Sequence, residues 1–317
     1  MIHTIVFVVF NVLIPQFFNF PIAFKKHKEY EYHLSYKKVS FYYYMGSQTL
    51  VIRTETNKIL NKGYANINDL EKFKKILDNI IFEVTGMSNL KLVLNRVDYY
   101  VDFMNDIKRN ETADILELLY KHSDTYRHMK LDRNKNYKTS YYQKTKRGSH
   151  NLNCYYRYAK YQKEDLKGVF RMELQMKKRK IKSELKKYGV ARAIDNYWTK
   201  EAMQEYYFNF LRDFFHNCDY YRIDVAIQKI KRSNYKESMK NRLIDFITKI
   251  NKNGMTKAKK DYSAPTVKNY INKLEKIGIN PITISIDKPY KKMENLLDRA
   301  KRIAEKIYFK KEGIKNE

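Results

Sequence analysis

Three stretches of the sequence alternate apolar and polar residues and carry potentially reactive side chains at every second position. Successive side chains of a β-strand point to opposite faces, so each stretch would present one apolar and one polar face. The polar sets are Arg96, Asp98 and Asp102 within 94–103, Asn153, Tyr155 and Arg157 within 152–160, and Arg171, Glu173 and Gln175 within 170–177. If the three strands share a sheet, one of its faces gathers carboxylates, a tyrosine and several arginines.

This combination of side chains suits chemistry at a phosphate. Carboxylates hold hard divalent cations, and a tyrosine beside such an ion can attack a phosphate whose charge the metal and the arginines neutralise. Asp102 lies about 13 Å from Asp98 along an extended strand, so these two carboxylates cannot share one ion. The alternative is a one-sided antiparallel sheet, which always shows polar residues to water. On spacing alone this alternative is favoured.

Two neighbouring tyrosines compete for the role of nucleophile. Tyr155 and Tyr156 point to opposite faces of the predicted strand, so only one of them reaches the polar face. Tyr156 shares its face with Cys154, which suits burial. Tyr155 shares its face with Asn153 and Arg157, which suit a phosphate. We therefore expect Tyr155 to be the reactive residue.

The charge of the chain points to a polyanionic partner. Lysine and arginine number 64 against 35 aspartate and glutamate, a formal net charge of +29. A charge of this size opposes folding, and binding to nucleic acid is the simplest reason to keep it. The cations are spread along the chain instead of forming one amphipathic helix, which disfavours a membrane surface. Two cysteines cannot make a disulfide framework and suit a reducing compartment.

The usual sequence signatures of metal enzymes and nucleotide-driven enzymes are missing. The seven histidines form neither an HxH pair nor an HExxH helix, and two cysteines cannot build a zinc finger. There is no glycine-rich phosphate loop, which disfavours ATP-driven chemistry.

An apolar stretch at residues 5–24 has the composition of a signal peptide or a membrane span. Pro15 and Pro21 fit poorly in a short helix, and no lysine or arginine precedes the stretch. We favour a buried first strand over residues 2–10 followed by an apolar loop, with a membrane segment as the alternative.

The rest of the chain predicts an α+β protein, an antiparallel sheet with helices packed on one side. Strand patterns occur at 30–36, 49–54, 90–103, 137–145, 151–161 and 170–177, and helical patterns at about 70–84, 114–121, 183–188 and 199–215. Charge and polarity rise at 232–238. We therefore expect a catalytic domain over 1–232 and a small helical region over 233–317.

One helix of the C-terminal region has clear ends. Ser263 can cap it, Pro265 falls in its first turn and Gly278 stops it. With a helix at about 240–250 and a short strand at 281–286, the outline fits a winged helix-turn-helix, although DNA readout and plain packing fit equally well. The side chains that would face outward and contact nucleic acid are Lys268, Asn269, Asn272 and Lys273.

In order and spacing, these motifs resemble those of the filamentous-phage gene II/gene X replication initiators and, more distantly, plasmid rolling-circle initiators of the Rep-trans type. Arg-Val-Asp at 96–98 resembles the family's Arg-Ile-Asp strand, and Arg-Met-Glu at 171–173 resembles its Arg-Phe-Glu strand. Leu-Asn-Cys-Tyr-Tyr-Arg at 152–157 resembles the strand with the nucleophilic tyrosine, and residues 57–63 resemble a segment ahead of the first long helix. The resemblance covers roughly residues 45 to 220.

Such proteins nick one strand of a double-stranded origin, stay linked to the 5′ phosphate through tyrosine and later rejoin the strand. The resemblance implies that Tyr155 is the nucleophile, that Asp98 and Glu173 bind Mg²⁺ or Mn²⁺, and that Arg157 stabilises the pentavalent phosphate. Arg157 stands where the family more often has lysine. On the same polar face, Arg96 and Arg171 would contact the nucleic acid.

The partners implied are double-stranded origin DNA, the nicked single strand and the helicase and polymerase of a host cell, in its cytoplasm and without a membrane. Two other classes stay open. One is a non-catalytic, sequence-specific DNA-binding protein that uses the C-terminal helices. The other is a mobilisation relaxase or transposase with the same tyrosine chemistry, which would want a histidine cluster that this sequence lacks.

Overall fold

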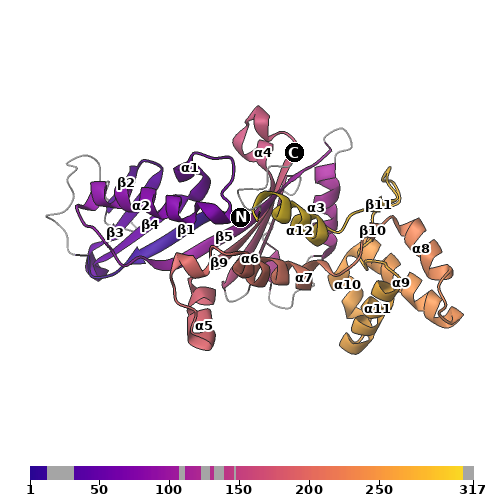
Figure 1. Cartoon of the computed structure of the whole chain (residues 1–317). Coiled ribbons are helices and arrows are strands. Elements are labelled where there is room, and N and C mark those ends of the chain that lie inside the picture. Colours follow the sequence, from indigo (N-terminus) through magenta and orange to yellow (C-terminus); the bar gives the residue numbers. More distant parts are fainter. Residues whose placement is uncertain (13–31, 107–110, 123–128, 132–138, 146–147, 310–317) are drawn as a thin grey trace.

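A computed structural model describes the chain outside residues 13–31, 107–110, 123–128, 132–138, 146–147 and 310–317. Its strands are β1 (Ile2–Val9), β2 (Tyr32–Tyr36), β3 (Val39–Tyr44), β4 (Thr49–Glu55), β5 (Val93–Met104), β6 (Met129–Leu131), β7 (Ser140–Thr145), β8 (His150–Tyr156), β9 (Val169–Lys177), β10 (Tyr220–Tyr221) and β11 (Lys292–Met293). Within the described residues, the first nine form one sheet in the order β2-β3-β4-β1-β5-β9-β8-β7-β6 (Figure 1). Neighbouring strands in this sheet are antiparallel.

The first strand of the chain lies in the middle of the sheet, between β4 and β5. All eight residues of β1 are buried, as expected for a central strand with a neighbour on each edge. The first strand predicted from the sequence is therefore confirmed, whereas most of the predicted apolar loop lies outside the described residues. In the part of the chain that the structure describes, no helix is long and apolar enough to cross a membrane.

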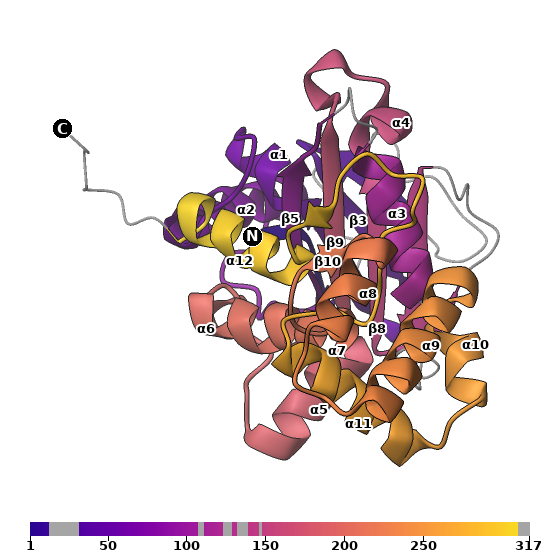
Figure 2. The ribbon, with the colours of Figure 1, turned by 90° about the vertical axis from the view of Figure 1, so that its right-hand side faces the viewer.

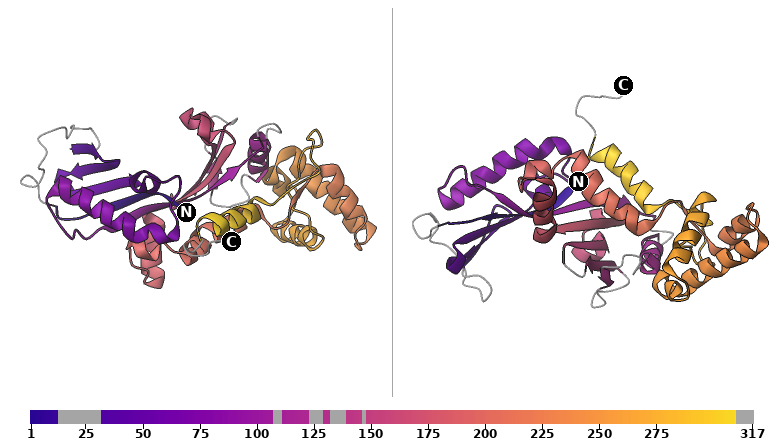
Figure 3. Two further views of the ribbon diagram at one scale, coloured as in Figure 1. Left: turned by 45° about the horizontal axis from the view of Figure 1, so that its top comes forward. Right: turned by 90° about the horizontal axis from the view of Figure 1, so that it is seen from below.

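Helices cover one face of the sheet. Figure 3 shows α2 (Leu70–Thr85), α6 (Lys200–Met203), α7 (Asn209–Phe215) and α12 (Leu296–Ile307) in a row along this face. The π-helical stretch Gln204–Phe208 joins α6 to α7, and from it Tyr207 donates a hydrogen bond of 2.9 Å to the carbonyl oxygen of Met172. The buried core on this side includes the apolar sets of β5 and β9, Val97, Tyr99, Val101, Phe103, Phe170, Met172, Leu174 and Met176. The predicted α+β class is confirmed.

Four further helices lie at the ends of the strands or follow them directly. They are α1 (Thr56–Leu60), α3 (Glu111–His122), α4 (Arg157–Tyr161) and α5 (Lys178–Tyr188). The strand predicted over 151–161 is too long, because the chain turns into α4 immediately after Tyr156. This change of direction alters which side chains accompany Tyr155.

The C-terminal region is helical, as predicted (Figure 2). It contains α9 (Glu237–Asn253), α10 (Met255–Lys260), α11 (Ala264–Lys276) and α12, and α8 (Ile223–Lys231) comes directly before it. The Ser263 side chain accepts a hydrogen bond from the backbone N–H of Thr266, which confirms the predicted cap of α11. The strand predicted at 281–286 is wrong, since this segment contributes only an isolated bridge between Ile284 and Arg222.

The last helix packs on the sheet. The Tyr308 ring, just after α12, meets the Tyr100 ring of β5 edge-on at 5.7 Å, and the carbonyl oxygen of Tyr308 accepts from the N–H of Ile67 at 3.2 Å. The predicted boundary near residue 232 stays a prediction, but α12 cannot be removed without uncovering part of the sheet.

Candidate functional site

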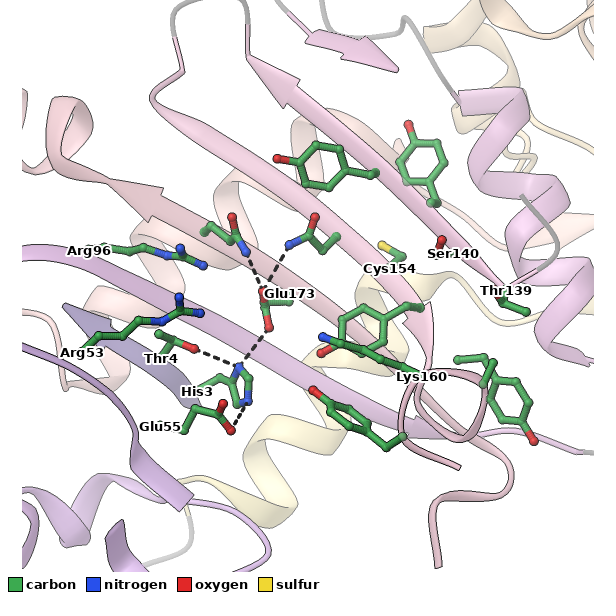
Figure 4. Close-up of a pocket in the computed structure, with 18 residues that line it drawn as sticks. His3, Thr4, Arg53, Glu55, Arg96, Thr139, Ser140, Cys154, Lys160 and Glu173 are labelled. Carbon is green, nitrogen blue, oxygen red and sulfur yellow. Dashed lines mark hydrogen bonds and ion pairs between the residues drawn. The ribbon is translucent and has the colours of Figure 1, made fainter. Parts of the chain in front are cut away.

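A cavity of about 460 Å³ opens on the polar face of the sheet, opposite the face that Tyr207 contacts (Figure 4). Residues of β1, β4, β5, β7, β8, β9 and α4 line it. Of the residues predicted from the sequence, Tyr155, Glu173 and Arg96 line this cavity, whereas Asp98, Arg157 and Arg171 do not.

The strand register explains this grouping. Tyr155 lies directly opposite Arg171, and Asn153 lies opposite Glu173 across the β8–β9 pair. On the other edge of β9, Gln175 lies opposite Asp98. Directly opposed residues of antiparallel strands share a face, so the three strands bring their polar sets together as the alternation predicts.

The Tyr155 hydroxyl is buried without a hydrogen-bond partner among the described residues. Tyr155 is 8% exposed. Burial raises the pKa of the phenol, and the positive charge of Arg171 opposes this effect. The Lys160 ammonium lies over the ring, 4.5 Å from its centroid. A buried hydroxyl without a hydrogen-bond partner, on a residue that lines a cavity and has cations nearby, is a candidate to interact with an anionic ligand.

Glu173 is held ionised at the centre of the cavity. Its Oε1 accepts hydrogen bonds from Asn153 Nδ2 at 3.2 Å and from Gln175 Nε2 at 2.9 Å. Its Oε2 lies 3.1 Å from Nδ1 of His3. Burial alone would raise the pKa of Glu173, but His3 in particular lowers it to about 2.

His3 bridges two carboxylates. Its Nε2 lies 3.4 Å from Oε2 of Glu55, while its Nδ1 faces Glu173 (Figure 4). Burial lowers the pKa of His3, but the hydrogen bonds to Glu173 and Glu55 outweigh burial and raise it. The pKa of Glu55 is lowered to about 2, mainly by His3. A protonated imidazole that donates from both nitrogens accounts for this arrangement.

Asp98 lies beneath the cavity and not in its wall. It is fully buried, and the Arg96 guanidinium donates from Nε to Oδ1 at 2.8 Å and from Nη2 to Oδ2 at 2.6 Å. Burial raises the pKa of Asp98 to about 6, although Arg96 opposes the shift. Arg96 is thus partly neutralised while it still lines the cavity.

The donor atoms of Asp98 and Glu173 suit a hard cation, since Mg²⁺ prefers carboxylate oxygens. Each of their oxygens already has a protein partner, namely Arg96, His3, Asn153 or Gln175. Among the described residues, no group of three or more His, Cys, Asp or Glu side chains is arranged to hold a metal ion. A bound cation would have to compete with these partners, and the metal pair stays a prediction.

Arg157 and Arg171 meet at Asp102. Arg171 donates from Nε to Oδ1 and from Nη2 to Oδ2 at 2.7 Å each, and Arg157 donates from Nη1 to Oδ2 at 3.1 Å. Arg171 is 1% exposed, so the contact with nucleic acid expected of it is not available in this arrangement. Arg157 starts α4 instead of continuing the strand, so it does not share a strand face with Tyr155 as expected.

Sequence reasoning missed several residues of the site. Lys160 reaches the cavity only because the chain turns into α4, and the alternation of a strand gives no sign of that turn. His3, Glu55 and Arg53 come from β1 and β4, and the pairings of β1 with β4 and with β5 are long-range. The register of the β1–β5 pairing also shifts between Ile2 and Ile5, the interval that contains His3 and Thr4.

The outward face of α11 is placed as predicted. Lys268, Asn269 and Asn272 are exposed, and Lys273 is half-buried with its Nζ 4.9 Å from the centroid of the Tyr235 ring. None of these residues lines the cavity beside Tyr155.

No protein-family model matches the sequence, and no curated protein matches it. Among solved structures, the rolling circle replication initiator protein from Geobacillus stearothermophilus is similar over 56% of this chain and 73% of its own, with 10% identity and a TM-score of 0.33. A likeness of this degree carries neither fold nor activity over to this chain.

Proposed function

We propose that this chain is a DNA nicking and joining enzyme that initiates rolling-circle replication of a phage or a plasmid. The observation that carries the proposal is Tyr155, which lines a cavity together with Lys160, Arg96 and Glu173 and whose buried hydroxyl has no hydrogen-bond partner among the described residues. A phenol with no internal partner is left free for a ligand group. The net charge of +29 supports DNA as the partner.

In the proposed reaction the Tyr155 oxygen attacks the scissile phosphorus. A bond forms between the tyrosine oxygen and phosphorus, the phosphorus–O3′ bond breaks, the phenol loses its proton and the released 3′ oxygen gains one. Lys160 and Arg171 favour the phenolate by their charge. Rejoining is the reverse reaction, with the 3′ hydroxyl as the attacking group.

The predicted Mg²⁺ or Mn²⁺ ion belongs to this proposal. Asp98 and Glu173 would hold it, and when bound it would neutralise charge on the phosphate oxygens. Arg96 and His3 hold the same carboxylates in place and supply positive charge at the cavity. Origin DNA, the nicked strand and host replication proteins are the partners that follow from this function.

An SDS-resistant adduct tests the proposal. The protein is incubated with Mg²⁺ and a labelled pool of single-stranded oligonucleotides of random sequence, and the label is followed on a denaturing gel. Wild-type protein should retain label, and Tyr155→Phe should retain none. Tyr156→Phe is the matched control, because the Tyr156 hydroxyl only accepts a weak bond of 3.5 Å from the N–H of Gly168. Equal labelling of Tyr155→Phe and wild type would refute the proposed nucleophile.

A non-catalytic DNA-binding function is the second candidate, favoured by the exposed polar face of α11. Asn269, Asn272 and Lys273 of this face border a surface hollow of about 490 Å³ that also includes Lys276, and Lys268 is exposed outside that hollow. Combined substitution of Lys268 and Asn272 by alanine should abolish preference for origin duplex while adduct formation survives. If the wild type binds duplex DNA selectively but forms no adduct with any strand, the second candidate replaces the first.

A further inference from the structure

A second cavity of about 280 Å³ adjoins the first on the same face of the sheet. The two cavities share Arg53 and Glu55, so they adjoin at these residues on the face of the sheet between β8 and β3. The second cavity is lined by Ser35, Lys38, Val39, Ser40, Tyr42, Arg53, Thr54, Glu55 and Lys58. None of the residues predicted to carry the chemistry lies in it.

Three cations, Arg53, Arg96 and Lys177, lie in a row across the strands, and the first two of them line the cavities. The register pairs Arg53 with Val6, Val6 with Arg96, and Arg96 with Lys177, so these residues lie in line over β4, β1, β5 and β9. Arg53 and Arg96 are two strand spacings apart, about 10 Å between their backbones. Figure 4 shows both at the end of the first cavity that is remote from Lys160.

Arg53 marks the junction of the two cavities. It is exposed, and it forms no ion pair or hydrogen bond with a described residue. Arg96, in contrast, is tied to Asp98. An arginine that keeps its full charge in a hollow is suited to bind a phosphate.

The far end of the second cavity offers cations and an aromatic surface. Lys38 and Lys58 are exposed there, and Lys58 pairs with Glu55 at 3.0 Å. The Tyr42 ring stacks on the His33 ring with centroids 4.6 Å apart and an angle of 12° between the planes. Stacked rings beside cations are the usual surface on which proteins bind the bases of single strands.

We propose that the second cavity binds the unpaired nucleotides that adjoin the scissile phosphate. A backbone phosphate lies on Arg53, and a base stacks on Tyr42. The single strand thereby runs from Tyr155 across β9, β5, β1 and β4 to β3. This inference rests on the proposed function for the identity of its ligand, but it concerns residues that take no part in the reaction.

Binding of oligothymidylate tests the inference without any cleavage. The protein carries Tyr155→Phe, and the labelled strand has about 16 nucleotides, the upper range of single-strand platforms. A second strand of equal length and charge lacks its bases. Fluorescence anisotropy measures Kd for both strands at several salt concentrations. Lys75→Gln, an exposed charge on α2, is the control for Arg53→Gln.

Arg53→Gln should raise Kd for both strands about fivefold. It should also reduce the slope of log K against log salt by about 0.7, since one phosphate contact is lost. Tyr42→Leu should raise Kd for the strand with bases about fivefold or more and leave Kd for the abasic strand unchanged. Lys75→Gln should change neither. The inference fails if Arg53→Gln behaves like Lys75→Gln, or if Tyr42→Leu affects both strands equally.

The same variants separate this inference from the proposed function. The chain with Tyr155 intact could bind the strand through Arg53 and Tyr42 and yet form no covalent adduct. This result would support the strand-binding site and contradict the proposed nicking activity. Conversely, the strand could form an adduct at Tyr155 while its binding does not depend on Arg53. This result would support the nicking activity and contradict the strand-binding site.

Discussion

Removing the Asp102 carboxylate should strongly destabilise the protein. Asp102 holds both Arg171 and Arg157, and Arg171 is 1% exposed. Burial opposes the charge of Arg171, but Asp102 more than compensates and raises the pKa of the guanidinium. Asp102→Ala leaves this buried cation without a counter-ion, at a cost of about 3–5 kcal/mol. A loss of this size lowers Tm by about 4–8 °C for a chain of 317 residues.

Thermal unfolding followed by circular dichroism at pH 7 measures this loss. Glu83→Ala is the matched control, because it removes a carboxylate from an exposed pair with Lys37 and should leave Tm nearly unchanged. Adding Arg171→Met to Asp102→Ala should recover most of the stability, since the unpaired charge disappears. If the double variant is no more stable than Asp102→Ala, an unpaired charge is not the cause of the loss.

Three further predictions concern the cavity and the core. Lys160→Ala should slow adduct formation about 100-fold, since the Lys160 ammonium lies over the Tyr155 ring. Arg157→Ala should slow adduct formation much less, because Asp102 holds Arg157 outside the cavity. Equal losses of rate in the two variants would refute this difference. Glu173→Ala should abolish nicking while strand binding measured by anisotropy persists, and EDTA should have the same effect on wild-type protein. Nicking that continues in EDTA would show that the metal assignment is wrong. Burial lowers the pKa of His122 and lowers that of His216 to about 4. The stability that these neutral rings contribute is present above their unfolded pKa of about 6.5 and is lost as the pH falls from there toward 4. Tm should therefore drop over this interval, less in His216→Gln than in wild type, and an unchanged pH profile would contradict the assignment.

The polar face shared by β5, β8 and β9 was predictable because alternation is a local property. Asp98, Tyr155 and Glu173 lie on one face since each strand keeps period two along its length, and the sequence displays that period directly. The same holds for α11, where Ser263 and the helical spacing define the helix without tertiary information. Burial was harder to predict, because Arg171 and Asp98 read as polar residues and yet pack beneath the cavity.

Contacts that depend on long-range pairing were not predictable from one sequence. His3 reaches Glu173 only because β1 enters the sheet beside β5, and Arg53 reaches the same hollow because β4 pairs with β1. The end of β8 was also missed. Residues 157–161 continue the tyrosine-rich end of β8 and contain no glycine or proline, so the change into α4 has no local breaker to signal it. The sequence therefore predicted Arg157 as the cation beside Tyr155, whereas the cation over the Tyr155 ring is Lys160.

The most direct test of the account is the position of the covalent bond between protein and DNA. The adduct is isolated after reaction with a labelled single strand, digested with protease and nuclease, and sequenced by mass spectrometry. We expect a nucleotide linked through phosphate to Tyr155, the hydroxyl that is buried without a partner among the described residues. A phosphate link at Tyr156, or at a tyrosine outside β8, would contradict the account.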